Sequence, residues 1–212
     1  MAAHTEDEII EAVKTCIDEI ALNDANFVEE QDDVEMDKII KSKIHDAYRF
    51  VLTHADWSLI DPDTSITEVS VGADLIGSVK LPDNFVRLCS ARFQSWPLYI
   101  SQPVYWDDKE FATLADSYAG GTWERPKVGM VLDPWKTLKL YKAKDTSDPA
   151  EIRIVTDNYT EGSGVDIPDA LYPSFIYYVS GLTLLTYKDE HADSMFNQAL
   201  VLMGVSPSNK QE

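Results

Sequence analysis

One helix-length segment of the sequence is apolar on nearly its whole circumference. It begins near Pro173, since Pro is tolerated in the first turn of a helix and not in its interior. The apolar residues of the segment are Phe175, Ile176, Tyr177, Tyr178, Val179, Leu182, Leu184 and Leu185. A helix without a polar face has to be covered on all sides, either by its own domain or by a neighbouring subunit.

Periodic apolar residues predict three more helices. Residues 6–22 carry one apolar stripe at three- and four-residue spacing, and Thr5 with Glu8 forms a capping box at its start. Residues 40–54 carry a second stripe. Residues 195–204 carry a third stripe, which ends at a glycine. Helices are therefore expected in both the first and the last part of the sequence.

The residues between these helical regions have the character of extended strands, with apolar residues in alternation or in short runs between turn signals. Leu81-Pro82-Asp83 is expected to form a turn, because Pro removes a ladder donor and Asp closes local turns. A short helix is expected after Asp107, with Glu110 completing a capping box. The expected strands are residues 69–73, 79–81, 85–93, 97–100, 128–132, 138–141 and 151–155.

The order of these elements predicts an α+β fold, in which N- and C-terminal helices form an antiparallel bundle around a central β-rich insertion. A chain of 212 residues is long enough for one sizeable core, so we expect a single domain over residues 1–212. Residues 5–54 and 166–204 would form the helical part, residues 64–157 the insertion, and residues 205–212 a mobile tail.

The formal charge of −19 is concentrated at the start of the sequence. Residues 1–37 hold 13 Asp and Glu against one Lys, while residues 38–212 hold 24 acidic and 17 basic residues. The acid-rich residues 23–33 are expected to connect two helices. A chain with this charge repels phosphate backbones, which argues against tight wrapping of nucleic acid and leaves room for a wall past which DNA slides.

The two cysteines and the hydropathy indicate where such a chain is made. Cys16 and Cys89 have apolar neighbours and no metal-binding spacing, so buried thiols in a reducing compartment are expected rather than a disulfide. The sequence has no signal-peptide pattern and no run of eighteen apolar residues. We therefore expect a soluble protein that is made in a cytoplasm and has no contact with a membrane.

Sequence motifs for catalysis, cofactors or metals are weak. Asp61, Asp63 and Ser65 begin like a calcium loop, but Ile66 stands where such a loop needs Gly. A metal enzyme could use Asp189, His191 and Asp193, although residues at this spacing do not share one helix face. There is no nucleophile-elbow motif, and the glycine pairs are too short to cradle phosphates. We expect no catalytic, cofactor-binding or metal-binding residues.

Two groups of residues are candidates for contacts with other molecules. Lys136, Lys139 and Lys142 could meet the acidic N-terminal segment of another copy, or could form a solvated edge that discourages aggregation. The second group is aromatic, and its members could be core residues or interface anchors. They are Trp96, Tyr99, Tyr105, Trp106, Trp123 and Trp135.

The sequence also resembles a known family in several stretches. These are KLPDNFVRLCSARFQSWPLYI, then YWDDKEFATLADSYAGGTWERPKVGMVLDPWKTLKLYKAKDTSDPAEIRIVTDNYTE, then IPDALYPSFIYYVSGLTLLTYKDEHADSMFNQALVLMG. Together they resemble the head-to-tail adaptor proteins of short-tailed bacteriophages, also called connector or tail tubular A-like proteins. The match lies in the Leu81-Pro82-Asp83 turn, in Arg87 and Arg92, and in the closing helices. The acid-rich N-terminal segment is similar to ring proteins of crAss-like phages.

The resemblance implies a structural virion protein at the head–tail junction, made in the cytoplasm of a bacterial host. Such adaptors form a ring, typically of twelve copies, beneath the portal protein. The ring joins the portal to the next tail ring, and double-stranded DNA passes through its channel without sequence-specific binding. The alternative is an acidic soluble binding module, directed at the host or at cargo, without affinity for the portal.

For individual residues, the resemblance implies only structural roles. Phe175, Tyr178, Val179 and Leu182 are expected to pack helices together, in part between subunits. The tail containing Ser206, Pro207 and Lys210 is expected to become ordered on the portal.

Overall fold

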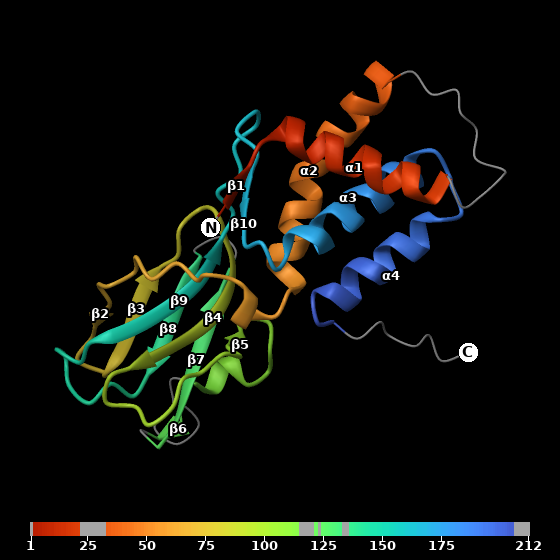
Figure 1. The fold of residues 1–212 in the computed structure, drawn as a ribbon. Coiled ribbons are helices and arrows are strands. Elements are labelled where there is room, and N and C mark those ends of the chain that lie inside the picture. The colour runs from red at the N-terminus through yellow and green to blue at the C-terminus, as the bar shows by residue number, and fades with distance from the viewer. Residues whose placement is uncertain (1, 22–32, 115–120, 123, 133–135, 206–212) are drawn as a thin grey trace, which may run out of the picture. The chain divides into compact units, whose positions relative to one another are not determined.

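The computed structural model describes residues 2–21, 33–114, 121–122, 124–132 and 136–205. The fold is mixed, with α-helices and antiparallel sheets, and the chain divides into two compact units (Figure 1). The first, which we call the helical unit, contains Met1–Asp61 and Asp157–Glu212. The second, which we call the β unit, contains Pro62–Thr156.

The α-helices described in the helical unit are α1 (Glu6–Ala21), α2 (Asp33–His54), α3 (Tyr172–Thr186) and α4 (Ala192–Leu202). The capping box predicted at the start of α1 is confirmed. The Thr5 amide donates to Glu8 Oε2 at 2.9 Å, and the Glu8 amide donates to Thr5 Oγ1 at 3.3 Å. Of the acid-rich connection predicted over residues 23–33, only Asp33 is described, and it is the first residue of α2.

Helix α3 contacts α1, α2 and α4, which explains why it has no polar face. Phe175 and Val179 are fully buried. The Tyr178 ring stacks on Phe50 of α2 with 3.9 Å between centroids and lies 5.1 Å from Phe196 of α4. At Gly181 a side chain would begin 2.7 Å from the Phe196 ring, so the glycine allows α4 to approach closely. The apolar surface of α3 is therefore buried mainly against other helices of the same chain.

A short strand pair in the helical unit has no counterpart among the predicted elements. Strand β1 (Ala2–His4) pairs antiparallel with β10 (Val165–Ile167). Gly164 precedes β10 with φ +80°, and a Cβ atom there would lie 1.9 Å from the His4 carbonyl oxygen. Only glycine fits this backbone position without strain. Residues 165–167 form a strand, so the C-terminal helical part, predicted over residues 166–204, begins only at α3.

The β unit contains two sheets of different size, in which all described pairs except β5–β7 are antiparallel. In the larger sheet the strand order is β2-β3-β8-β7-β5, with β6 beside β7 and with β5 parallel to β7. The smaller sheet pairs β4 with β9. The bounds are β2 Ser70–Val71, β3 Ile76–Lys80, β4 Phe85–Phe93, β5 Val104–Tyr105, β6 Gly121–Thr122, β7 Arg125–Val131, β8 Thr137–Tyr141 and β9 Ala150–Thr156.

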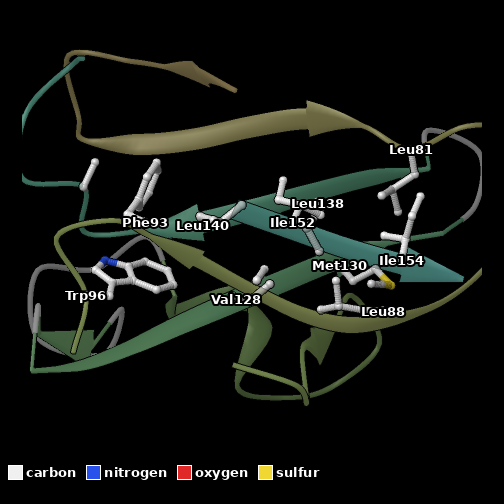
Figure 2. Close-up of a cluster of buried hydrophobic side chains, with 12 residues drawn as sticks. Leu81, Leu88, Phe93, Trp96, Val128, Met130, Leu138, Leu140, Ile152 and Ile154 are labelled. Carbon is white, nitrogen blue, oxygen red and sulfur yellow. The ribbon is translucent and has the colours of Figure 1, made fainter. Parts of the chain in front are cut away.

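The hydrophobic core of the β unit draws side chains from both sheets (Figure 2). The Leu81-Pro82-Asp83 turn leads from β3 in one sheet to β4 in the other, as the sequence predicted for a turn between two extended segments. The Phe85 amide donates to the Pro82 carbonyl at 3.1 Å and closes the turn. The core residues are Leu81, Leu88, Ala91, Phe93, Trp96, Val128, Met130, Leu138, Leu140, Ala143, Ile152 and Ile154.

Two local predictions in the β unit are wrong. Residues 97–100 do not form a strand, and only Ile100 bridges to Ala91. Asp107 does not cap a helix, because the helical turn there is a short 3₁₀ segment, η2 (Phe111–Thr113), that follows Glu110. The neighbouring carboxylate of Asp108 accepts the Tyr105 amide instead, at 3.0 Å. In both places tertiary contacts decide the local conformation of a short segment.

Candidate interaction surfaces

The α3 residues that the sequence proposed as packing residues lie largely inside the helical unit. Phe175 and Val179 have no exposed surface, and Tyr178 lies between the aromatic rings of α2 and α4. Leu182 is half-buried, whereas Leu185 is 55% exposed. We therefore assign Phe175 and Val179 to the core of the chain itself. The tail residues Ser206, Pro207 and Lys210 lie outside the described residues.

The three lysines proposed as intersubunit contacts do not form one row. Lys136 Nζ donates to the Asp83 carbonyl at 2.7 Å and so holds the β3–β4 turn. Lys142 has φ 72°, and its carbonyl accepts the Trp96 indole N–H at 2.9 Å. Only Lys139 lies within β8. Lys136 thus stabilises a neighbouring turn through its side chain, and Lys142 holds Trp96 through its backbone carbonyl.

The aromatic group predicted between residues 96 and 135 divides into core and surface residues. Trp96 is buried and meets Phe93 edge to face, with 5.2 Å between centroids. Tyr105 and Trp106 are exposed at the edge strand β5, Trp106 by 56%. Exposed Trp and Tyr side chains are typical anchors of protein interfaces. Trp123 and Trp135 lie outside the part of the chain that the structure describes.

The helical unit also exposes large apolar residues at the end of α4. Trp57 is 51% exposed and Val201 is 56% exposed, and Leu202 is exposed as well. The Asp56 amide donates to the Met203 carbonyl at 3.4 Å, which places the 3₁₀ segment η1 (Trp57–Leu59) beside the end of α4. We call Trp57, Val201 and Leu202 the apolar corner.

An arginine-rich face of the β4–β9 pair points away from the core. Its arginines are half-buried, and at one end Arg87 Nε and Val155 are buried. Leu88 and Ala91 of β4 pair with Ile154 and Ile152 of β9 in the core. Residues on the opposite face are Arg87, Ser90 and Arg92 of β4, which pair with Val155, Arg153 and Glu151 of β9. We call Arg87, Arg92, Arg153, Glu151 and Tyr99 the arginine face.

Arg92, Glu151 and Tyr99 bind one another within this face. Arg92 donates through Nη2 to Glu151 Oε1 at 2.9 Å and through Nε to Oε2 at 3.2 Å. The Tyr99 hydroxyl donates to Glu151 Oε2 at 2.5 Å. The guanidinium carbons of Arg92 and Arg153 lie 4.1 and 5.1 Å from the Tyr99 ring centroid. The face therefore already holds one carboxylate between guanidinium groups and a phenol.

These bonds lower the pKa of the Glu151 carboxyl from its usual 4.5, mainly through Arg92 and then through Tyr99. Because the pKa is lower in the folded state, the stabilisation is complete above pH 4.5 and is lost as the pH falls through the folded pKa. We expect Tyr99→Phe to raise this pKa and Arg92→Leu to raise it further, measured by carbon-13 NMR of the carboxyl. Arg125→Leu is the control, and unchanged values in both test variants would contradict the assignment.

Contacts that could suggest acid–base chemistry occur in the helical unit. His45 Nε2 lies 2.8 Å from Asp157 Oδ2, and its ring stacks on Tyr159 with 4.6 Å between centroids. Burial raises the pKa of nearby Tyr48 to about 12, with Asp157 and Asp166 adding to the shift. These two contacts of His45 are with a carboxylate and with the face of an aromatic ring, and neither supplies a nucleophile for the imidazole to activate. We assign these contacts to the structure of the helical unit.

The two acidic motifs weighed as metal sites form local turns. Asp63 Oδ1 accepts the Ser65 amide at 2.7 Å, and Asp189 Oδ1 accepts the His191 amide at 2.8 Å just before α4. Among the residues that the structure describes, no three His, Cys, Asp or Glu side chains are grouped so that they could hold a metal ion. In the same residues no helix is both long and apolar enough to cross a membrane.

The charge is divided unequally between the two units. The β unit contains 13 Asp and Glu against 11 Lys and Arg, a net charge of −2. The helical unit contains 24 acidic and 7 basic residues, a net charge of −17.

No family model matches this chain, and no curated protein matches it. The surfaces and charges of the chain itself therefore have to support any functional proposal.

Proposed function

We propose that this chain is a structural virion protein, a subunit of a head-to-tail connector ring that docks beneath a phage portal. The observation that carries the proposal is the division of the chain into a strongly acidic helical unit and a nearly neutral β unit. A protein that lines a DNA channel needs a surface that does not bind phosphates, because phosphate neutralisation is what produces nonspecific affinity for DNA. A net charge of −17 on the helical unit meets this requirement.

In this proposal the helices form an antiparallel bundle, into which the β-rich residues 64–157 are inserted. Copies of the bundle stand side by side around the channel, in a ring that we expect to hold twelve subunits. The β unit meets the next tail ring, and residues 205–212 bind the portal. Each of these roles places a unit of the chain against a different partner.

Exposed apolar residues on both units support contacts with more than one partner. The apolar corner, with Trp57 and Val201, lies on the helical unit, while Tyr105 ends the edge strand β5 of the β unit and Trp106 follows it directly. Large apolar side chains that remain exposed together often mark interaction sites. A ring subunit needs such contacts with its neighbours and with the rings above and below it.

The test is to mix the purified protein with the portal encoded in the same genome and to measure particle mass and projection symmetry. We expect a stacked ring with the symmetry of the portal. A variant with Trp57→Ser and Val201→Ser should bind the portal or its neighbours more weakly, whereas Glu68→Gln, at an exposed site of the β unit, should not. Two unassociated species at every salt concentration would contradict the proposal and favour a soluble acidic binding module.

A further inference from the structure

We propose that the arginine face of the β unit binds the acidic face of helix α1 on a second copy of this chain. This inference deepens the proposed function and rests on it, because it names two surfaces through which neighbouring copies would meet. Three of the five arginines in the sequence belong to the arginine face. Together with Glu151 they give it a net charge of +2 in a chain of net charge −19.

The chemistry of the arginine face is suited to carboxylates. A guanidinium group is planar and can bind a carboxylate through two parallel hydrogen bonds. Arg92 binds Glu151 in this manner, and Arg153 lies beside the same Tyr99 ring. Arg87 and Arg153 both lie near the Cys89 thiol, whose pKa burial raises and these two cations lower. The three cations thus follow one another along the β4–β9 pair.

Helix α1 presents exposed carboxylates of complementary charge. Asp7, Glu11 and Asp18 are exposed and lie within about 40° of one another around the helix axis. The buried residues of α1, among them Val13 and Ile17, point in another direction. The lysine on the same stripe is held by an ion pair, with Lys14 Nζ 2.7 Å from Asp37 Oδ1. We call Asp7, Glu11 and Asp18 the acidic stripe.

The two surfaces also have similar lengths. The β9 partners of Arg87 and Arg92 are Val155 and Glu151, which are four residues apart because β4 is irregular between the two arginines. This spacing corresponds to about 13 Å at the rise of a strand. Asp7 and Asp18 are eleven residues apart on α1, which corresponds to about 16 Å at the rise of a helix. Arg153 lies between the two β4 arginines, since it pairs with Ser90, and Glu11 lies between the two aspartates. Arg92 and Arg153 can therefore face carboxylates of the acidic stripe, with the half-buried Arg87 adding positive charge at one end of the face.

DNA is a weaker fit for the arginine face than a carboxylate-rich helix. Every copy of the chain carries the acidic stripe, so its carboxylates are present at the same concentration as the arginine face. The carboxylate of Glu151 is already bound on this face in the geometry that an additional carboxylate would use. We therefore assign the face to a second copy of the chain.

Sedimentation velocity of the full chain tests this inference by exchanging charges. We expect self-association at about 50 mM salt that weakens at least tenfold at about 500 mM. Arg153→Glu alone and Glu11→Lys alone should each weaken it by at least tenfold. A mixture of the two variants should associate again, because each reversed surface meets its complement on the other variant. Arg125→Glu and Asp46→Lys carry matched charge changes elsewhere and should leave self-association unchanged.

Three outcomes would overturn the inference. They are a wild-type chain that is monomeric at both salt concentrations, a mixture of the variants that fails to associate, and controls that weaken association as much as the test variants. Binding of a DNA duplex that Arg153→Glu abolishes, without self-association of the protein, would assign the face to nucleic acid instead. Portal binding is measured in parallel: a portal-bound ring that survives Arg153→Glu would leave the proposed function standing and remove only this pairing.

Discussion

We expect Phe175→Ala to lower the free energy of unfolding of the helical unit by about 3–5 kcal/mol. Phe175 has no exposed surface, and it lies on the helix that contacts the other three α-helices described in its unit. Removing its ring leaves a cavity among several elements that cannot all close on it. Urea denaturation followed by far-ultraviolet circular dichroism measures the change.

The matched control is Leu185→Ala on the same helix. Leu185 is 55% exposed, so the free energy of unfolding of the isolated chain should change by only about 0.5 kcal/mol or less. The two variants together distinguish apolar residues of α3 that are buried within the chain itself from those that are exposed in the isolated chain and available to a neighbouring subunit. If Leu185→Ala destabilised the isolated chain as much as Phe175→Ala, the assignment of Phe175 to the core of the chain and of Leu185 to its surface would be wrong.

The sequence predicts the long elements well because their patterns repeat many times. Strand β4 spans Phe85–Phe93, as predicted, and the Thr5–Glu8 capping box is present at the start of α1. Short elements are different. The β1–β10 pair has three residues on each strand, too few for a periodic signal, and it depends on Gly164 meeting the His4 carbonyl across the fold. Such a contact has no local signature in the sequence.

The candidate surfaces were predictable only in part, for the same reason. The alternation of side chains along a strand places Glu151 and Arg153 on the same face of β9, and it assigns Arg92 to one face of β4. Alternation alone does not predict that these two strand faces lie on the same side of the sheet, because the register of β4 against β9 contains irregularities near Arg87 and Ser90. Tyr99 belongs to the aromatic group that the sequence predicts as core or interface residues, but its bond to Glu151 spans 52 residues. The joining of distant charges into one face is a property of tertiary structure.

Phe93→Ala should lower the free energy of unfolding of the β unit by about 3–5 kcal/mol. The Phe93 side chain is fully buried in the core between the two sheets. Its ring lies over Gly77 of β3, where a Cβ atom would be 2.5 Å from Phe93 Cζ and 2.8 Å from Val69 Cγ1. For that reason Gly77→Ala alone should also destabilise the unit, by about 1–3 kcal/mol through overpacking.

The two changes should compensate each other in the double variant. With Ala at residue 93 the ring that blocks Gly77 is gone, so the new methyl group enters space that the ring occupied. We expect the double variant to be more stable than the sum of the single effects predicts, by about 1–2 kcal/mol. Urea denaturation followed by near-ultraviolet circular dichroism gives the four free energies of the cycle. In a Phe175→Ala background, Gly77→Ala should keep its full cost, because Phe175 belongs to the other unit. Additive effects of Phe93→Ala and Gly77→Ala would show that the glycine is required by Val69 and not by the aromatic ring.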